Sequence, residues 1–93
     1  MERKLNSVGK ACFVKYYSQF ANLNVSNFEL VETLHKENGY TVKACQTRVS
    51  KARSLIEDGC TCSALKIIIS SNRLGSNTVE EAQKIYSEIC LRD

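Results

Sequence analysis

Four cations and no acidic residue fall between residues 41 and 56 of this chain. Short hydroxyl side chains and one amide stand among them, so a helix made from this stretch could approach a groove closely. Such chemistry suits a polyanion, because Lys and Arg reach phosphates while Gln reaches a base edge. The candidate DNA-contacting residues are Lys43, Gln46, Thr47, Arg48, Ser50, Lys51 and Arg53.

Helical periodicity places these polar residues on one side of a single element. At 100° per residue Val42, Cys45, Val49, Ala52 and Ile56 fall within a narrow arc, which predicts the face that packs on neighbouring helices. The polar residues occupy the opposite arc, with the two arginines on its flanks. A helix that needs only to be soluble usually intersperses glutamates at four-residue spacing. Unopposed cations therefore favour a DNA-facing surface, and a solvated face of a structural bundle is the alternative.

The stretch "GYTVKACQTRVSKAR", residues 39 to 53, resembles the recognition-helix segment of the helix-turn-helix domain of bacterial sigma factors, region 4. It resembles the LuxR-type regulators more loosely. Gly39, Tyr40 and Thr41 match the turn and the helix cap of that pattern. Residues that match identically or conservatively follow, namely Thr47, Arg48, Val49, Lys51, Ala52 and Arg53.

The resemblance extends upstream to the preceding helix and covers about 25 residues in total. Glu29, Leu30, Val31 and Leu34 resemble the family's first motif helix, which is one turn longer here. What the resemblance implies is a recognition helix laid in the major groove of double-stranded DNA. On this chain it implies that Lys43, Gln46 and Thr47 read bases. It also implies that Arg48, Lys51 and Arg53 hold phosphates. If the first helix lies alongside the recognition helix, Lys4, Lys10 and Lys15 would add further phosphate contacts.

The rest of the chain predicts an all-α fold in one domain, residues 1–93. Proline is absent, and Gly39, Gly59 and Gly75 divide the chain at intervals of about one helix plus a turn. We therefore expect a compact bundle of about five short helices that contains the helix-turn-helix. The apolar series from Val8 to Leu23 recurs at three and four residues, which predicts a single first helix.

Two capping boxes mark the starts of later helices. Ser26 with Glu29 opens the second helix, in which Phe28, Val31 and Leu34 are expected to face inward. Thr78 with Glu81 opens the last helix in the same way. Its predicted apolar side consists of Val79, Ala82, Ile85, Tyr86 and Ile89.

The segment from 63 to 71 is apolar nearly all round and contains three consecutive isoleucines. A single strand would have no partner, so we expect a short buried helix. Cys90 and Leu91 extend the apolar side of the last helix beyond what one small core consumes. This excess favours a homodimer through the C-terminal helices, with a fully internal stripe as the alternative.

Five cysteines, an odd number, favour reduced thiols over a disulfide framework. The start of the chain lacks the apolar region of a secretory signal, and no apolar run reaches the roughly 20 residues of a membrane span. We therefore expect a cytoplasmic protein that does not enter a membrane. Cys60 and Cys62 with His35 lack the second cysteine pair of a structural zinc site, so no metal and no cofactor are expected.

Nothing in the sequence indicates an enzyme, because no carboxylate pair, glycine-rich phosphate loop or cysteine with a nearby histidine is present. The sequence predicts a DNA-binding protein, either a small transcriptional regulator or an accessory factor. The rival interpretation is a helical adaptor or inhibitor that binds another protein. Its contact surface would be Ile67 to Ile69 and the last helix.

Overall fold

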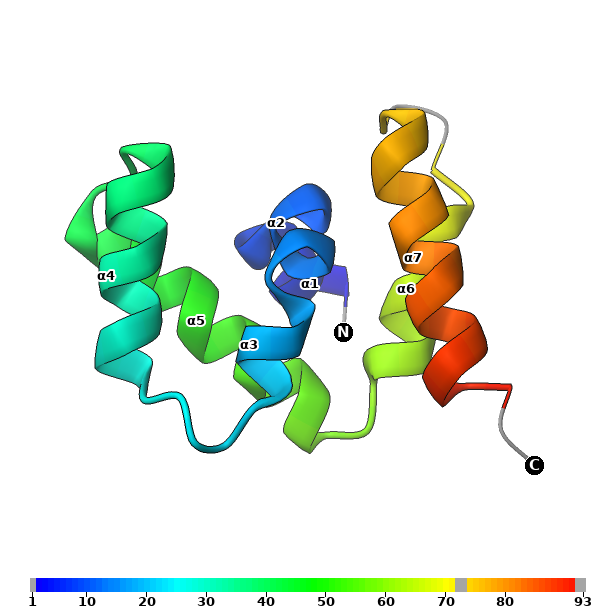
Figure 1. Ribbon diagram of the computed structural model, residues 1–93, viewed down its shortest axis with the longest axis horizontal. Helices are drawn as coiled ribbons and strands as arrows, with labels where there is room; N and C mark the ends of the chain where they lie inside the picture. The colour runs from blue at the N-terminus through cyan, green and yellow to red at the C-terminus, as the bar shows by residue number, and fades with distance from the viewer. Residues whose placement is uncertain (1, 72–73, 92–93) are drawn as a thin grey trace.

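The computed structural model describes residues 2–71 and 74–91, and within these residues the chain forms seven helices (Figure 1). The predicted all-α class is confirmed. The helices are α1 (Glu2–Val8), α2 (Lys10–Lys15), α3 (Tyr17–Ala21), α4 (Asn27–Asn38), α5 (Val42–Glu57), α6 (Thr61–Ile69) and α7 (Ser76–Ile89).

The N-terminal segment is divided into three short helices, so the prediction of one continuous helix there is wrong. Gly9 takes φ 90°, a left-handed conformation that ends α1 and turns the chain into α2. Tyr16, at φ −108° and ψ 14°, then separates α2 from α3. This division accounts for the difference between about five predicted helices and the seven observed.

The short N-terminal helices lie between two helical pairs (Figure 1). α4 and α5 form the pair on one side, and α6 and α7 form the pair on the other. α5 packs against α1 as well as α4, whereas α7 packs against α6 and α2. The N-terminal segment thus connects the two pairs.

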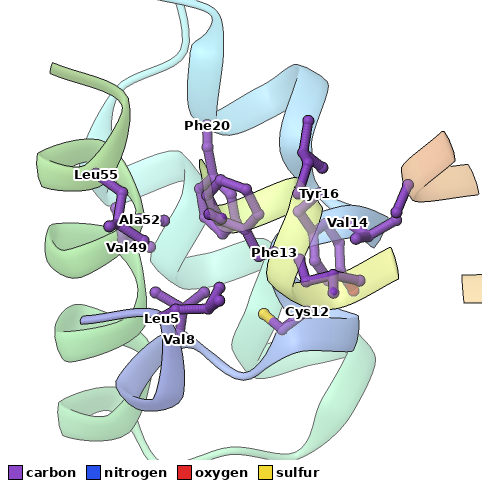
Figure 2. Packing of buried hydrophobic residues seen from close by; sticks show 14 of the residues in the cluster. Leu5, Val8, Cys12, Phe13, Val14, Tyr16, Phe20, Val49, Ala52 and Leu55 are labelled. Carbon is purple, nitrogen blue, oxygen red and sulfur yellow. The ribbon is translucent and has the colours of Figure 1, made fainter. Parts of the chain in front are cut away.

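A single cluster of buried side chains takes members from all seven helices. Val49, Ala52 and Leu55 point from α5 toward the N-terminal helices (Figure 2). The Phe13 and Phe20 rings, both fully buried, stack with their centroids 6.4 Å apart. Burying an aromatic side chain of this size contributes about 1.5–3 kcal/mol, so these rings anchor the middle of the molecule.

The start of α4 follows the sequence prediction closely. Ser26 Oγ accepts a hydrogen bond from the Glu29 backbone N–H at 3.1 Å, and Glu29 Oε2 accepts one from the Ser26 N–H at 3.3 Å, which confirms the capping box. Leu30 and Leu34 are buried. The prediction that Phe28 faces inward is wrong, because it lies about 200° around the helix from Leu30 and is 71% exposed.

α5 begins after a three-residue turn, Gly39 to Thr41, and Thr41 Oγ accepts a hydrogen bond from the Ala44 N–H at 3.1 Å. This confirms the predicted cap. The predicted inner arc is confirmed for Cys45, Val49 and Ala52, which are fully or almost fully buried, and Ile56 is half-buried. Val42 is the exception, since it is the first residue of the helix and is 49% exposed.

The C-terminal pair confirms the helix predicted in the isoleucine segment but not the second capping box. α7 begins at Ser76, and its N-cap is Gly75, which makes no side-chain cap. The Thr78 N–H already donates to the Gly75 carbonyl at 3.1 Å, so Thr78 lies inside the first turn. The box predicted from Thr78 and Glu81 is therefore wrong.

A disulfide joins Cys62, near the start of α6, to Cys90, at the end of α7, with the two Cα atoms 5.9 Å apart. The expectation that all five cysteines are reduced is wrong for this pair, because the hairpin of α6 and α7 brings together residues that are 28 apart in sequence. Disulfides are rare in the reducing cytoplasm. The cysteine content therefore no longer supports a cytoplasmic location.

Metal-ligand clusters and membrane-spanning helices are both absent from residues 2–71 and 74–91. No group of three or more His, Cys, Asp or Glu side chains lies close enough to hold a metal ion there. In the same part of the chain, none of the helices combines the length and apolar character that a membrane span requires.

Candidate nucleic-acid interface

Five of the seven candidate residues lie exposed on one side of α5. These residues, which we call the outer face of α5, are Lys43, Gln46, Thr47, Ser50 and Lys51. They stand opposite the buried arc of Cys45, Val49 and Ala52. None of the five side chains makes a hydrogen bond or ion pair with another described residue. The outer face is therefore polar, cationic and open.

Arg53 is not part of this open surface, because its guanidinium points to the loop between α3 and α4. Its Nε donates to the Phe20 carbonyl at 3.2 Å, and its Nη2 donates to the Asn22 carbonyl at 3.1 Å. It also donates to the carbonyls of Gln19 and Val25 and to the side-chain oxygen of Asn27. These acceptors include the last carbonyls of α3, which have no partner within their own helix.

Arg48 is also turned toward the protein. Its Nη1 donates to the carbonyl of Val8, the last residue of α1. Its guanidinium carbon lies 4.0 Å from the centroid of the Tyr40 ring, within the range of a cation–π contact. Burial raises the pKa of the nearby Cys12 thiol, and the positive charge of Arg48 opposes that rise. Arg48 thus contacts three parts of the chain outside its own helix turn.

The two arginines predicted to hold phosphates are therefore occupied by protein acceptors, whereas the lysines are not. Position on the helix distinguishes the two groups. Arg48 and Arg53 flank the apolar arc, where a long side chain reaches the neighbouring elements. Lys43 and Lys51 lie near the middle of the polar arc, where no neighbour is within reach. The sequence contained this angular signal, but it did not identify the carbonyls that accept the hydrogen bonds.

α1 packs alongside α5. This was the condition under which the N-terminal lysines were expected to add phosphate contacts. Lys4 Nζ, however, donates to Ser54 Oγ and to Asp58 Oδ2, both at 2.7 Å. The hydrogen bond from Lys4 holds the pKa of Asp58 below its ordinary value. Lys4 is thus neutralised by an ion pair and does not extend the cationic surface.

The other two N-terminal lysines are placed differently. Lys10 is half-buried in the first turn of α2. Lys15 is exposed and lines a depression between α2 and α7 together with Asn77 and Glu81. Because α7 belongs to the pair on the far side of the N-terminal helices, Lys15 does not join the outer face of α5 (Figure 1).

A hollow of about 370 Å³ borders the C-terminal half of the outer face. Its walls come from α5, from the start of α4 and from the loop before α4, and they include Leu23, Asn27, Ser50 and Glu57. Leu23 was predicted to belong to the buried stripe of the first helix. It is instead 89% exposed, because the chain has left α3 before it reaches this residue.

The apolar surface that the rival adaptor interpretation requires is smaller than predicted. Ile68 is fully buried in the shared core, and Ile67 and Ile69 are half-buried against it. Leu91 remains exposed after the end of α7. Most of the isoleucine run is therefore used inside the molecule.

Comparison of the chain with protein-family models, with curated proteins and with solved structures finds no match. The functional argument consequently depends on the site itself. That site is an exposed helix face with two lysines and no acid, positioned by a short turn and by two arginines that contact neighbouring segments.

Proposed function

We propose that this chain binds double-stranded DNA through the outer face of α5 and acts as a small transcriptional regulator or accessory factor. The observation that carries the proposal is the exposure of five polar side chains on one helix face, with two lysines and no acid among them. A helix is narrow enough to enter the major groove of B-form DNA. The three-residue turn between α4 and α5 supports the proposal, because a helix-turn-helix presents its second helix to DNA after a similarly short turn.

The spacing on the outer face supports separate roles for its residues. Lys43 and Lys51 are eight residues apart, which corresponds to about 12 Å along a helix. Ammonium groups at that separation suit phosphates on either side of a groove. Gln46 and Thr47 lie between them, where side chains face base edges in this mode of binding. Ser50 is short and permits close approach.

The arginines have a different part in this proposal from the one that the sequence predicted. Arg48 and Arg53 hold α5 against its neighbours, so the cationic contacts to phosphate come from lysines. A surface with few phosphate contacts binds DNA weakly by itself. A dimer joined through the C-terminal helices would present two reading helices to one duplex, and half-sites one helical turn apart require these helices to be about 34 Å apart.

The half-buried side chains of Ile89 and Cys90 and the exposed side chain of Leu91 support a homodimer through this end. Sedimentation equilibrium of the wild-type protein and of Leu91→Lys tests it. We expect a dimer that the added charge dissociates. A monomeric wild-type protein would remove this part of the proposal.

The test of DNA binding is a fluorescence-anisotropy titration with a random duplex at several salt concentrations. Wild-type affinity should fall steeply as the salt concentration rises, so the slope of log K against log salt is negative. Each phosphate contact that a substitution removes should make this slope shallower by about 0.9. Lys43→Met and Lys51→Met should each show this decrease. Lys84→Met is the matched control, because Lys84 is an exposed lysine on α7, away from the outer face.

An affinity that does not respond to salt, or equal slopes in all three variants, would contradict the proposal. Salt-insensitive binding to a protein, weakened by Leu91→Lys and not by Lys51→Met, would favour the adaptor or inhibitor instead. The unfolding free energy of each lysine variant should remain within about 0.5 kcal/mol of the wild type, since these side chains are exposed.

A further inference from the structure

We propose that Arg48 is a positioning residue that fixes the tilt of α5 by fastening it to the bend between α1 and α2 and to the turn that precedes α5. The inference depends on the proposed function only for its DNA-binding readout. Its structural part stands on contacts within the chain.

The contacts of Arg48 come from segments that are distant in sequence. Val8 lies 40 residues before Arg48 and accepts the hydrogen bond from its guanidinium. Tyr40 lies in the turn between α4 and α5 and places its ring under the same guanidinium. One planar side chain therefore joins the end of α1, the turn and the first half of α5. Arginine suits this role because it stacks on a ring and donates in its own plane at once.

The Val8 carbonyl is an acceptor that needs an external donor. α1 ends at Val8, because Gly9 has a left-handed conformation with φ 90°. The last carbonyls of a helix have no partner within the helix, and a positive charge at that end is favourable. Arg48 supplies both the donor and the charge.

Gly9, the next residue, borders the same guanidinium. A Cβ atom added at Gly9 would lie 2.9 Å from Nη1 of Arg48, in addition to the strain of the positive φ. The Arg48 guanidinium thus lies directly against the backbone of the bend between α1 and α2. Arg48 and Gly9 fit together as parts of one junction.

The turn is fixed from the other side as well. The carbonyl of Tyr40 lies 2.6 Å from Nδ1 of His35, in the last part of α4. The backbone of Tyr40 is thereby held to α4, while its ring contacts Arg48. Removing the guanidinium would free the turn from α1 and release the tilt of α5, although every residue of the outer face would keep its identity.

This arrangement distinguishes a positioning residue from a phosphate contact. We compare Arg48→Met with Lys51→Met, because both changes remove one charge from the same helix. Arg48→Met should lower the melting temperature and weaken DNA binding about tenfold, with an unchanged salt slope. Lys51→Met should leave the melting temperature unchanged and reduce the slope by about 0.9. The proposal is overturned if Arg48→Met behaves as Lys51→Met does.

Tyr40→Leu provides a second variant that carries no charge change and remains informative if Arg48→Met does not fold. It should weaken binding with the slope unchanged. NMR supplies a readout that needs no DNA: ring currents from Tyr40 should shift the Arg48 side-chain protons upfield, and Tyr40→Leu should abolish that shift. Arg48 resonances that do not respond to Tyr40→Leu would overturn the proposal.

The two proposals fail in different ways. Wild-type protein that shows the ring-current shift and binds no DNA would refute the proposed function and leave the junction intact. If the wild-type protein lacks the ring-current shift of the Arg48 protons, but DNA binding is lost when the lysines of the outer face are replaced, then only the proposed role of Arg48 is refuted.

Discussion

The α4–α5 pair and the α6–α7 pair are held in place by different means. α5 is fastened by hydrogen bonds from two arginine side chains to main-chain carbonyls of other segments. α7 is fastened to α6 by apolar packing and by the disulfide between Cys62 and Cys90. One pair is therefore held by charged donors and the other by a covalent link, and each should respond to a different perturbation.

The difference shows that the type of a residue does not identify the group that its side chain contacts in the folded protein. The sequence predicted that the arginines of α5 bind phosphate, and it predicted that Cys62 and Cys90 are reduced thiols. In both cases the partner lies far along the chain and becomes a neighbour only when the helices pack. The lysines of the outer face have no such partner among the described residues, and they keep the exposure that the sequence predicted, as do the other three residues of that face.

Reduction of the disulfide should produce the largest effect. A link between residues 28 apart stabilises a fold by about 3–4 kcal/mol through the chain entropy of the unfolded state. Urea denaturation with and without dithiothreitol, followed by circular dichroism, measures the loss. Cys60→Ser is the matched control, because Cys60 is a free thiol next to the link. Equal midpoints in both conditions would mean that α7 is held by packing alone.

Arg53→Met should have the next largest effect. The change removes the donors that pair with carbonyls at the end of α3 and in the loop before α4. Hydrogen bonds from a charged donor contribute about 1.5–3 kcal/mol each when buried, and partial exposure reduces that figure. We expect a loss of about 2–3 kcal/mol in the free energy of unfolding, measured by urea denaturation.

Lys51→Met is the control for the arginine, since it removes one charge from the same helix and Lys51 has no partner among the described residues. Its unfolding free energy should stay within about 0.5 kcal/mol of the wild type. A similar loss in both variants would show that net charge, and not the hydrogen bonds of Arg53, sets the stability of this pair.

Local signals in the sequence predicted much of the fold. The cap at Thr41, the capping box at Ser26 and the apolar arc of α5 each depend on residues within one or two helical turns, and each is confirmed. The division of the first helix was not predicted, because the apolar spacing continues across Gly9. A glycine inside an apolar series is compatible both with a helix and with a bend, and only its neighbours select one.

The candidate site was predicted in part for the same reason. Exposure of the outer face follows from helical periodicity, which is a local property. The contacts of Arg48 join it to Val8 and Tyr40, and no local pattern specifies which carbonyl or ring a long side chain reaches. The exposed side chains of Leu23 and Phe28 were missed because apolar residues were assigned to the core by type.

The two capping sequences offer a matched pair of substitutions with a smaller effect. Ser26→Ala should destabilise the protein by about 1 kcal/mol, because Ser26 Oγ accepts the Glu29 N–H at the start of α4. Thr78→Ala should change stability by less than about 0.5 kcal/mol, because Thr78 lies within α7 and caps nothing. Thermal denaturation of both variants checks the difference. Equal losses would contradict the assigned start of α7.

The ion pair between Lys4 and Asp58 should give the smallest effect, visible in its dependence on pH. The hydrogen bond and charge of Lys4 lower the pKa of Asp58 from its ordinary value of 3.8. A carboxyl whose pKa is lowered by folding binds its proton more readily in the unfolded chain. Its contribution to stability is therefore complete above pH 3.8 and is lost as pH falls through the lower folded value.

An NMR titration of the Asp58 carboxyl carbon measures this shift directly. In Lys4→Met the midpoint should move up toward the ordinary value, while the hydrogen bonds of Arg48 and Arg53 remain intact. α1 would then be attached to α5 through Arg48 and apolar packing alone, so the variant isolates the contribution of the ion pair. A midpoint that is the same in both proteins would show that Lys4 does not hold Asp58 in solution, and that the α1–α5 contact depends on the arginine junction.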